Sequence, residues 1–215
     1  MQDWVAWHRA YDDPGSSLRV RLERVRRHMA RALDQAPPGP VQLISLCAGQ
    51  GRDVLGVLPD HPRRDDVSAV LIEADAQNAD LAVQGAVRAG LDQVHVRQAD
   101  AGVIASFADA LPADILLLCG IFGNVSAADI RRTIDAAATL CADGATVIWT
   151  RHRRPPDVTS QMRDWLAANG FDEVAFDALQ TESLMGVGVH RLVRRSPKIA
   201  GYPQQRLFTF GSHAR

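Results

Sequence analysis

The chain has 215 residues, of which 47% are hydrophobic and 23% are charged, and its formal net charge is −1. This length and composition are those of one globular domain with a full core. A charge so close to zero excludes a strong overall attraction for nucleic acid or an anionic membrane. No apolar run reaches the ~18 residues that are needed to span a bilayer.

The N-terminal sequence MQDWVAWHRAYDD has neither the basic nor the apolar region of a secretion signal. Three cysteines, Cys47, Cys119 and Cys141, lie far apart and lack metal-ligand spacing. We interpret them as reduced, buried thiols. Reduced thiols are typical of a cytoplasmic protein, and we expect one here. Histidines and acidic residues do not cluster at ligand spacing either, so we expect no bound metal.

Residues 1–38 are expected to form a helical lid that contains an aromatic cluster of Trp4, Trp7, His8 and Tyr11. The alternative, which is favoured for the two tryptophans, is a helix that packs them on the core. Ser16 or Ser17 can cap the helix SLRVRLERVRRHMARALDQA, which has one apolar face and ends before Pro37. We interpret its other face as solvent-exposed. That face carries Arg19, Arg21, Arg24, Arg26, Arg27 and Arg31.

Residues 39–211 are expected to form a single globular unit in which apolar strands alternate with helices. The strands are expected at VQLISLCA, SAVLIEA, VHVRQAD, ADILLLCG, ATVIWTRH, FDEVAFDAL and QRLFTF. One helix is expected from Arg52 through VLGVL, and an alanine-rich helix is expected after the second strand, ending at Ala89. Two more are expected over AADIRRTIDAAATL and DVTSQMRDWLAANG. This alternation predicts an α/β fold with a Rossmann-like, mostly parallel, seven-stranded sheet and helices on both faces.

The last two strands have no clear helix between them, so one of them is expected to run antiparallel. The segment GVGVHRL is interpreted as a loop that folds over the site, and the alternative is that it forms the seventh strand itself.

A glycine-rich turn follows the first strand. Ala48, Gly49 and Gly51 leave the backbone accessible where that strand ends. Ligands of doubly wound sheets bind beyond the carboxyl ends of the strands, so the turn is a candidate ligand site. Tight packing of a helix on the sheet is the alternative reason for small residues here.

Acidic residues end the next two strands. Glu73 can accept hydrogen bonds from both hydroxyls of a ribose, whereas Asp75 is better placed to cap the following helix. Asp100 can accept from an adenine amino group, while the amide of Ala101 can donate to the ring. An ordinary Asp-Ala-Gly turn is the alternative interpretation of Asp100.

In these motifs the chain resembles the class I S-adenosylmethionine-dependent methyltransferases from about Val41 to Phe210. LISLCAGQG resembles their glycine-rich motif, although that family usually has an acid in place of Ser45 and a glycine in place of Cys47, whose side chain is expected near the methionine part of the cofactor. NAD fits less well, since Val54 stands where the third glycine or alanine of its fingerprint should be. The cofactor residues that the resemblance implies are Ser45, Cys47, Ala48, Gly49, Gly51, Glu73, Ala74, Asp100, Ala101, Cys119 and Gly120, with Tyr11 and Arg21 as candidates for its carboxylate.

The methyl acceptor is expected beyond the fourth and fifth strands. In CGIFGN, Phe122 is a candidate pocket wall and Asn124 a candidate to orient a polar atom, unless Asn124 is a turn or capping residue. The sequence NPPY, found in many relatives that methylate nitrogen in nucleic acids and proteins, is absent. Its absence favours a small-molecule substrate.

His152 follows the fifth strand and is the candidate general base, because its reference pKa near 6.5 suits proton transfer at neutral pH. Arg151, Arg153 and Arg154 can bind an acidic substrate, or they form an exposed basic loop. His190 and Arg191 of GVGVHRL are further candidates for substrate binding.

We therefore expect an S-adenosylmethionine-dependent methyltransferase that transfers a methyl group in line to oxygen or nitrogen of a small molecule. The alternative is a non-catalytic, cofactor-binding scaffold subunit. RNA methylation is disfavoured, because the net charge is near zero and no aromatic residues are interleaved with the arginines. Homodimer formation is left open.

Overall fold

The computed structural model describes residues 9–194 and 205–210, so Trp4, Trp7 and His8 of the predicted aromatic cluster lie outside the described residues. Its helices are η1 (Arg9–Asp12), α2 (Ser17–Gln35), η2 (Leu58–Asp60), η3 (Arg64–Asp66), α3 (Ala76–Arg88), η4 (Ile104–Ser106), η5 (Ala108–Ala110), α4 (Ala127–Leu140) and α5 (Thr159–Ala168). Ser16 caps α2 by accepting a hydrogen bond from the amide of Arg19, as the sequence predicts.

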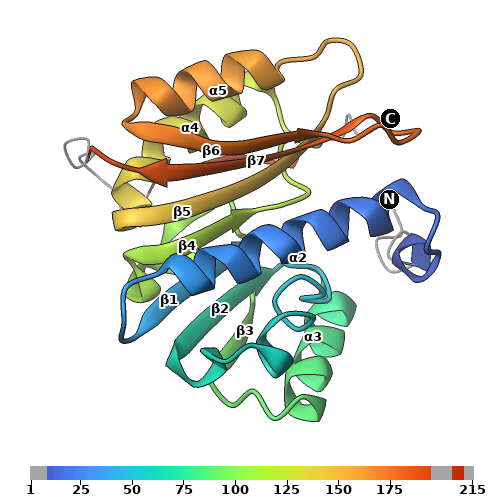
Figure 1. The fold of residues 1–215 in the computed structure, drawn as a ribbon, viewed down its shortest axis with the longest axis vertical. Helices are drawn as coiled ribbons and strands as arrows, with labels where there is room; N and C mark the ends of the chain where they lie inside the picture. Colours follow the sequence, from blue (N-terminus) through green and yellow to red (C-terminus); the bar gives the residue numbers. More distant parts are fainter. Residues whose placement is uncertain (1–8, 195–204, 211–215) are drawn as a thin grey trace.

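Within the described residues, one sheet contains seven strands (Figure 1). They are β1 (Val41–Leu46), β2 (Val67–Glu73), β3 (Val94–Gln98), β4 (Ala113–Leu118), β5 (Cys141–His152), β6 (Phe171–Ala178) and β7 (Met185–Leu192). Their order is β3-β2-β1-β4-β5-β7-β6, and β7 runs antiparallel to both of its neighbours while β1 to β5 pair in parallel. The predicted Rossmann-like, mostly parallel sheet is confirmed.

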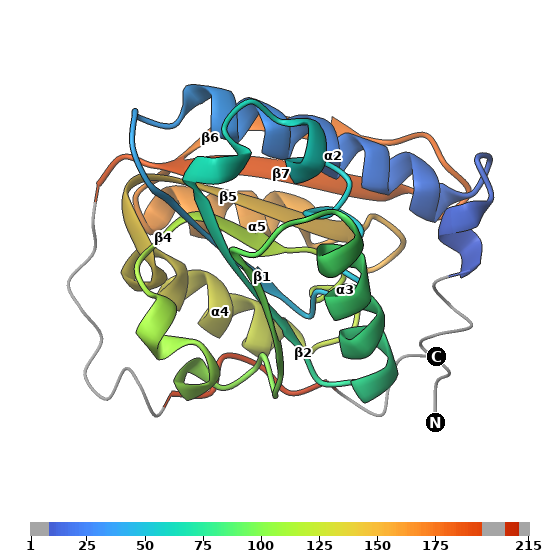
Figure 2. The same ribbon diagram turned by 90° about the horizontal axis from the view of Figure 1, so that it is seen from below.

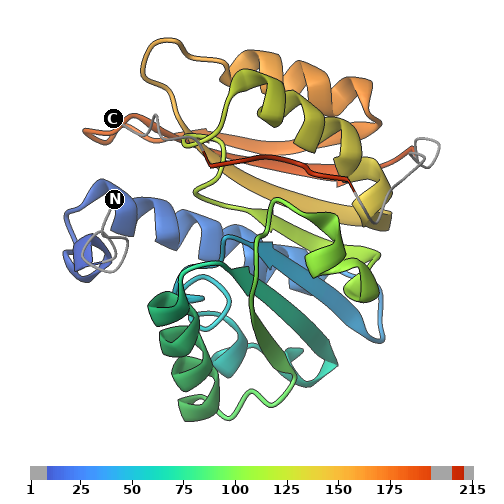
Figure 3. The same cartoon turned by 180° about the vertical axis from the view of Figure 1, so that it is seen from behind.

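Helices cover both faces of the sheet (Figures 2 and 3). On one face, Met29 and Leu33 of α2 and Ala86 of α3 belong to a buried apolar cluster. On the other face, a second cluster contains Ile130 of α4 and Leu166 of α5. Burying a sheet between two helical layers removes apolar area from water on both sides, which is the main stabilisation of such folds.

The N-terminal helix α2 is part of the core. Met29 and Leu33 are fully buried, and His28 lies 2.5 Å from the carboxylate of Asp177 in β6. The predicted solvent-exposed arginine face is wrong at two positions, because Arg21 is buried and Arg26 donates to the carbonyl of Arg52. A lid function stays a prediction, and both η1 and α2 contact the residue after the glycine turn, through Asp12 and Arg26 on Arg52.

The seventh strand was expected at QRLFTF, and this prediction is wrong. The strand is Met185–Leu192, which includes GVGVHRL, while residues 205–210 make an isolated bridge between Arg206 and Val103. Glycines weaken most strands, but here they make room for aromatic rings. A Cβ at Gly188 would lie 2.2 Å from the indole of Trp149, and one at Gly186 would lie 3.1 Å from the ring of Phe176.

The prediction of a helix from Arg52 is also wrong, because residues 52–57 form turns. In a helix the carbonyl of Arg52 would accept from the amide of Gly56, but it accepts instead from the guanidinium of Arg26, at 3.0 and 2.7 Å. The same guanidinium would lie 2.2 Å from a Cβ at Gly56. An arginine of α2 therefore takes the space and the acceptor that a helical turn would need.

Strand order reverses between β1 and β4, whose carboxyl ends are followed by the glycine turn and by Cys119. In doubly wound sheets ligands bind at such a switch point. Among the described residues, none of the helices is both long enough and apolar enough to cross a membrane.

Candidate functional site

The glycine turn after β1 is built from left-handed residues. Gly49 and Gly51 have φ values of +57° and +66°, and Cys47 adopts +53° although it has a side chain. A Cβ at Gly51 would lie 2.8 Å from Leu71, so this position requires glycine for space as well as for φ. The amide of Ala48 donates to the carbonyl of Ile72 at 3.0 Å, which holds the turn against β2.

Glu73 lies between the glycine turn and α3. Its Oε2 accepts from the amide of Gly49 at 2.7 Å, and its Oε1 accepts from the amide of Asp75 at 2.9 Å. Asp75 caps α3, as predicted, by accepting from the amide of Asn78. A carboxylate has about four acceptor positions, so two backbone donors orient Glu73 and leave acceptor positions for hydroxyl groups of a ligand.

Asp100 follows β3 and forms a turn of its own. One carboxylate oxygen accepts from the amide of Gly102 at 2.8 Å, and the other accepts from the guanidinium of Arg206, also at 2.8 Å. Asp100 therefore makes the expected turn, its contact with adenine stays a prediction, and its carboxylate lies at the same end of the sheet as Glu73. The following Ala101 is buried.

The thiol of Cys47 lies on the carboxylate side of the turn. Burial raises its pKa well above the usual value, and the negative charges of Glu73 and Asp100 raise it further. The expected position of this side chain near the methionine part of a cofactor stays a prediction. A thiol with this raised pKa stays neutral and is a packing group here.

Tyr11 and Arg21 meet at the other side of the turn. The guanidinium of Arg21 donates to the hydroxyl of Tyr11, and both side chains are buried. Burial is the main cause that raises the pKa of Tyr11, Arg21 opposes it, and the charges of Asp53 and Cys119 add to it. Tyr11 and Arg21 precede the first strand in the sequence, and the structure brings them next to the loops after β1 and β4.

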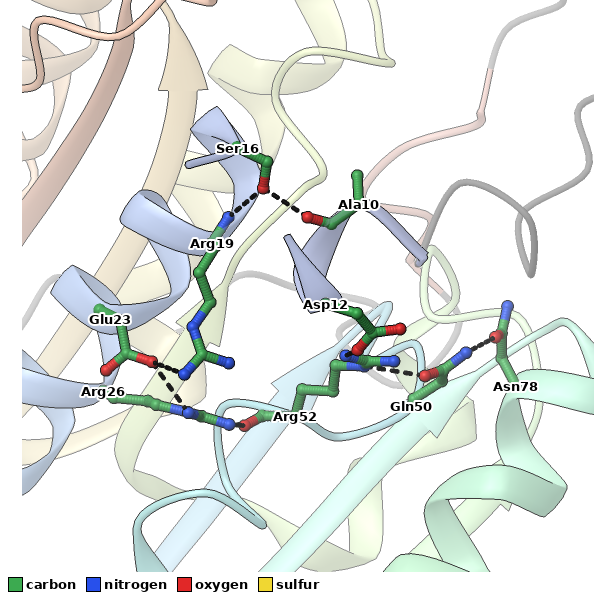
Figure 4. Close-up of polar contacts among 9 residues, drawn as sticks. All are labelled: Ala10, Asp12, Ser16, Arg19, Glu23, Arg26, Gln50, Arg52 and Asn78. Carbon is green, nitrogen blue, oxygen red and sulfur yellow. Dashed lines mark hydrogen bonds and ion pairs between the residues drawn. The ribbon is translucent and has the colours of Figure 1, made fainter. Parts of the chain in front are cut away.

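A polar network joins η1 and α2 to the glycine turn (Figure 4). Arg52 donates to Asp12 at 2.6 Å and to Gln50 at 2.9 Å, while Gln50 donates to Asn78 of α3 at 3.2 Å. The guanidinium of Arg52 also lies 5.5 Å from the ring centroid of Tyr11, within the range of a cation–π contact. Sequence reasoning missed this network.

Asp53 is a second residue that sequence reasoning missed. It is buried, burial raises the pKa of its carboxyl, and it accepts from the amide of Val54 at 2.9 Å. An acidic residue two positions after Gly51 was the available signal.

The other predicted cofactor residues lie at the same end of the sheet or in it. Ser45 is buried in β1 between Leu71 and Leu117 of the neighbouring strands. Ala74 is exposed beside Glu73. Burial raises the pKa of the Cys119 thiol.

The loop after β4 is held by bonds to its own backbone and to β5. Gly120 donates to the hydroxyl of Thr150 at 2.9 Å, and the side chain of Asn124 donates to the carbonyl of Gly120 at 2.7 Å. Asn124 is therefore a turn residue, and Ser126 caps α4. Phe122 is fully buried in the core, so it does not form the wall of an open pocket as predicted.

Arg151 and His152 end β5. Arg151 is buried and donates to the carbonyl of Phe122, so its guanidinium supports the loop after β4. His152 lies beside that loop, since a Cβ at Gly123 would be 3.3 Å from its ring. Burial, followed by the charges of Arg151 and Arg154, lowers the pKa of His152 below its ordinary value. The imidazole is therefore neutral at neutral pH and able to accept a proton.

His190 and Arg191 do not lie at this end of the sheet, contrary to our prediction. They belong to β7 and pair with Val147 and Thr146 in the middle of β5, whereas His152, at the carboxyl end of β5, pairs with Met185. His190 is buried and accepts a hydrogen bond from the indole of Trp149 at 3.2 Å. We therefore remove both residues from the candidate site.

Within the described part of the chain, no three histidine, cysteine or acidic side chains gather as metal ligands would. A hollow of about 340 Å³ lies between α3 and β3, lined by apolar residues such as Val83 and Val87. It is away from the loops at the carboxyl ends of the strands.

No protein-family model matches the chain, and no curated protein matches it. Solved structures share its fold. One is the magnesium protoporphyrin IX methyltransferase from Synechocystis PCC 6803, crystallised with bound S-adenosylmethionine, at 16% identity over 88% of this chain and 89% of that one, with a TM-score of 0.67.

Two further structures have lower scores. An O-methyltransferase family protein from Burkholderia thailandensis is 14% identical over 80% of this chain and 57% of that one, with a TM-score of 0.60. A candidate tRNA (m1A22) methyltransferase from Streptococcus pneumoniae is 20% identical over 84% and 72%, with a TM-score of 0.56. Strand order, glycine turn and these neighbours agree: the chain has the fold of the class I S-adenosylmethionine-dependent methyltransferases.

Proposed function

We propose that the protein is an S-adenosylmethionine-dependent methyltransferase that acts on a small molecule by in-line methyl transfer to oxygen or nitrogen. The observation that carries the proposal is the position of Glu73. Its carboxylate is oriented by the amides of Gly49 and Asp75, and it therefore lies against the glycine turn after β1, which borders the switch point where doubly wound sheets bind ligands.

The residues around this point fit an adenosyl cofactor. Gly49 and Gly51 keep the turn open for close approach, Glu73 has acceptor positions for a ribose, and Asp100 has a carboxylate for an adenine amino group. Tyr11 and Arg21 offer a hydroxyl and a cation for the carboxylate of the methionine part. When bound, the cofactor supplies an electrophilic methyl group whose leaving group is already activated by its positive charge.

The protein's own contribution to transfer is to hold the acceptor and to take up a proton. Positioning of two reactants in one site accounts for much of the rate in such displacements. His152 ends β5 beside the loop after β4, and its lowered pKa keeps an imidazole nitrogen available as acceptor for the proton that an oxygen or nitrogen nucleophile loses.

A small-molecule acceptor is favoured over RNA. The net charge of −1 gives no general attraction for a polyanion. Of the arginines near the site, Arg26 and Arg151 donate to backbone carbonyls of this chain rather than to solvent. Arg153 and Arg154 remain candidates for binding an acidic group on the acceptor.

A scaffold subunit that binds the cofactor without catalysis is the second candidate. It is favoured by the residues on the acceptor side of the site. Phe122 is buried in the core, and Asn124 and Arg151 donate to backbone carbonyls of this chain, so these groups already have partners within the protein. The two candidates share the same cofactor residues and differ in turnover.

Calorimetry with S-adenosylhomocysteine tests cofactor binding, and turnover of S-adenosylmethionine with a panel of small-molecule acceptors and tRNA tests catalysis. Binding with turnover of a small molecule is expected. Binding without turnover supports the scaffold, turnover of tRNA contradicts the substrate class, and absence of binding contradicts both candidates.

A further inference from the structure

Residues 205–210, here called the C-terminal strap, lie across the turn that contains Asp100 (dark red in Figure 2). The amide of Leu207 donates to the carbonyl of Gly102 at 2.7 Å, and the amide of Ile104 donates to the carbonyl of Gln205 at 3.2 Å. Leu207 and Phe208 are buried in the core cluster on the face of α4. The strap is therefore a seated part of the fold beside the predicted adenine position.

Close packing fixes the position of the strap along the turn. A Cβ at Gly102 would lie 2.2 Å from the carbonyl oxygen of Phe208, so the two backbones are in direct contact. On its other side, the carbonyl of Leu207 accepts from the hydroxyl of Thr133 in α4 at 3.3 Å. These contacts hold Arg206 next to the carboxylate of Asp100.

Arg206 donates a hydrogen bond to one oxygen of that carboxylate. Its guanidinium donates to Asp100 at 2.8 Å and to the carbonyl of Phe208 at 3.2 Å, while the amide of Gly102 occupies the other oxygen. An adenine amino group approaching Asp100 meets a carboxylate that already has a charged donor from this chain.

We propose that Arg206 is an internal competitor of the adenine amino group for Asp100 and thereby lowers the affinity for the cofactor and its selectivity for adenine. This inference rests on the proposed function. The side chains of Arg206 and Asp100 are 46% and 52% exposed, so the pair is a weak one that a ligand is able to displace.

The test compares wild type, Arg206→Ala and a control by calorimetry with two ligands, S-adenosylhomocysteine and its inosine analogue. These ligands lack the sulfonium charge, so a change in overall charge has little effect on them. The inosine analogue has a carbonyl oxygen in place of the amino group and has no donor there for Asp100. Arg131→Ala is the matched control, since Arg131 is also 46% exposed and pairs with Asp135 on α4.

Arg206→Ala is expected to bind S-adenosylhomocysteine about 1.5- to 5-fold more tightly than wild type, the range that an exposed ion pair allows. No such gain is expected for the inosine analogue or for Arg131→Ala. The difference between Arg206→Ala and wild type should shrink at high salt, which screens the competing pair.

Unchanged or weaker binding of S-adenosylhomocysteine by Arg206→Ala, or an equal gain for both ligands, would overturn the inference and leave the proposed function intact. If neither wild type nor Arg206→Ala binds S-adenosylhomocysteine, the proposed function fails and the inference fails with it.

Discussion

The cofactor side and the acceptor side of the candidate site are built differently. On the predicted cofactor side, Glu73 is oriented by two backbone amides and keeps acceptor positions for a ligand, while Asp100 accepts from one amide and from the guanidinium of Arg206. On the acceptor side, Asn124 and Arg151 use their donors on carbonyls of the same loop. Of the residues predicted there, His152 has the protonation state that the chemistry needs.

This difference shows that a side chain at the right end of a sheet is not by itself a ligand-binding group. A carboxylate can accept several hydrogen bonds and still accept more, whereas a buried arginine that donates to a carbonyl stabilises the loop. The proposed cofactor side therefore rests on several carboxylates and amides, whereas the proposed acceptor side depends on His152. Four changes test this comparison.

The largest effect is expected from His152→Ala, which should lower turnover by about 10²–10⁴ with little change in affinity for S-adenosylhomocysteine. The pH profile of the variant should also lose the inflection that His152 causes below pH ~6.5, where the protonated imidazole is inactive as a base. Steady-state kinetics with an acceptor from the panel measures both effects. The exposed His95, replaced by Ala, is the control, and turnover of His152→Ala within a few-fold of wild type would show that no base acts at this position.

His190→Gln tests whether the acceptor side extends to β7. Burial lowers the pKa of His190 to about 4, against ~6.5 in the unfolded chain. The unfolded chain therefore binds the proton first, and the wild type loses stability as pH falls from about 6.5 to about 4. Between pH 7.5 and pH 4 this contribution is about 3 kcal/mol.

The variant should lack that pH dependence and keep normal turnover. Denaturant unfolding at several pH values, with His95→Gln as control, measures the pH dependence of stability. Steady-state kinetics with an acceptor from the panel measures turnover. A large loss of turnover with unchanged stability would return His190 to the site.

Glu73→Gln is expected to weaken binding of S-adenosylhomocysteine by about 1.5–3 kcal/mol, the range for hydrogen bonds to a charged group. The glutamine keeps the size of the side chain but loses the charge and one acceptor oxygen. Calorimetry measures the affinity, and circular dichroism checks the fold. The exposed Glu182, replaced by Gln, should bind as wild type does, and equal affinities for all three proteins would remove the ribose function from Glu73.

The smallest effect is expected from Arg52→Ala, which removes the bonds to Asp12 and Gln50. Because Asp12 is exposed and Arg52 is only partly buried, we expect affinity for S-adenosylhomocysteine to fall by less than about fivefold. Asp12→Asn should add little to this loss in the double variant, since Arg52→Ala has already removed the contact between Arg52 and Asp12. Fully additive losses would show that Arg52 and Asp12 act separately.

Much of the fold was predictable because its signals are local. Ser16 and Asp75 cap helices at the predicted positions, and six of the seven strands lie at the apolar runs that predicted them. The seventh was missed because RLFTF has the pattern of a better edge strand than GVGVHRL, whose Gly186 and Gly188 leave space for the rings of Phe176 and Trp149. Only the folded sheet shows which ring each glycine faces.

The candidate site was predictable where it follows strand ends. Glu73 and Asp100 were found because the residue after a parallel strand lies at the ligand-binding edge. Arg52 with Asp12 and Arg206 with Asp100 are separated by 40 and 106 residues. No spacing rule connects residues so far apart, so these pairs required the structure.

The turns at residues 52–57 have a consequence for how the protein is made. The segment between β1 and β2 forms no α-helix, and the face that includes β1, β5 and β7 is packed instead by α2. A covering helix that precedes every strand in the chain leaves the ribosome before any strand does. Its main partner strands on this face, β5 and β7, are synthesised late, and β7 is the last strand of the sheet, so the apolar face of α2 stays unburied until most of the chain has been made.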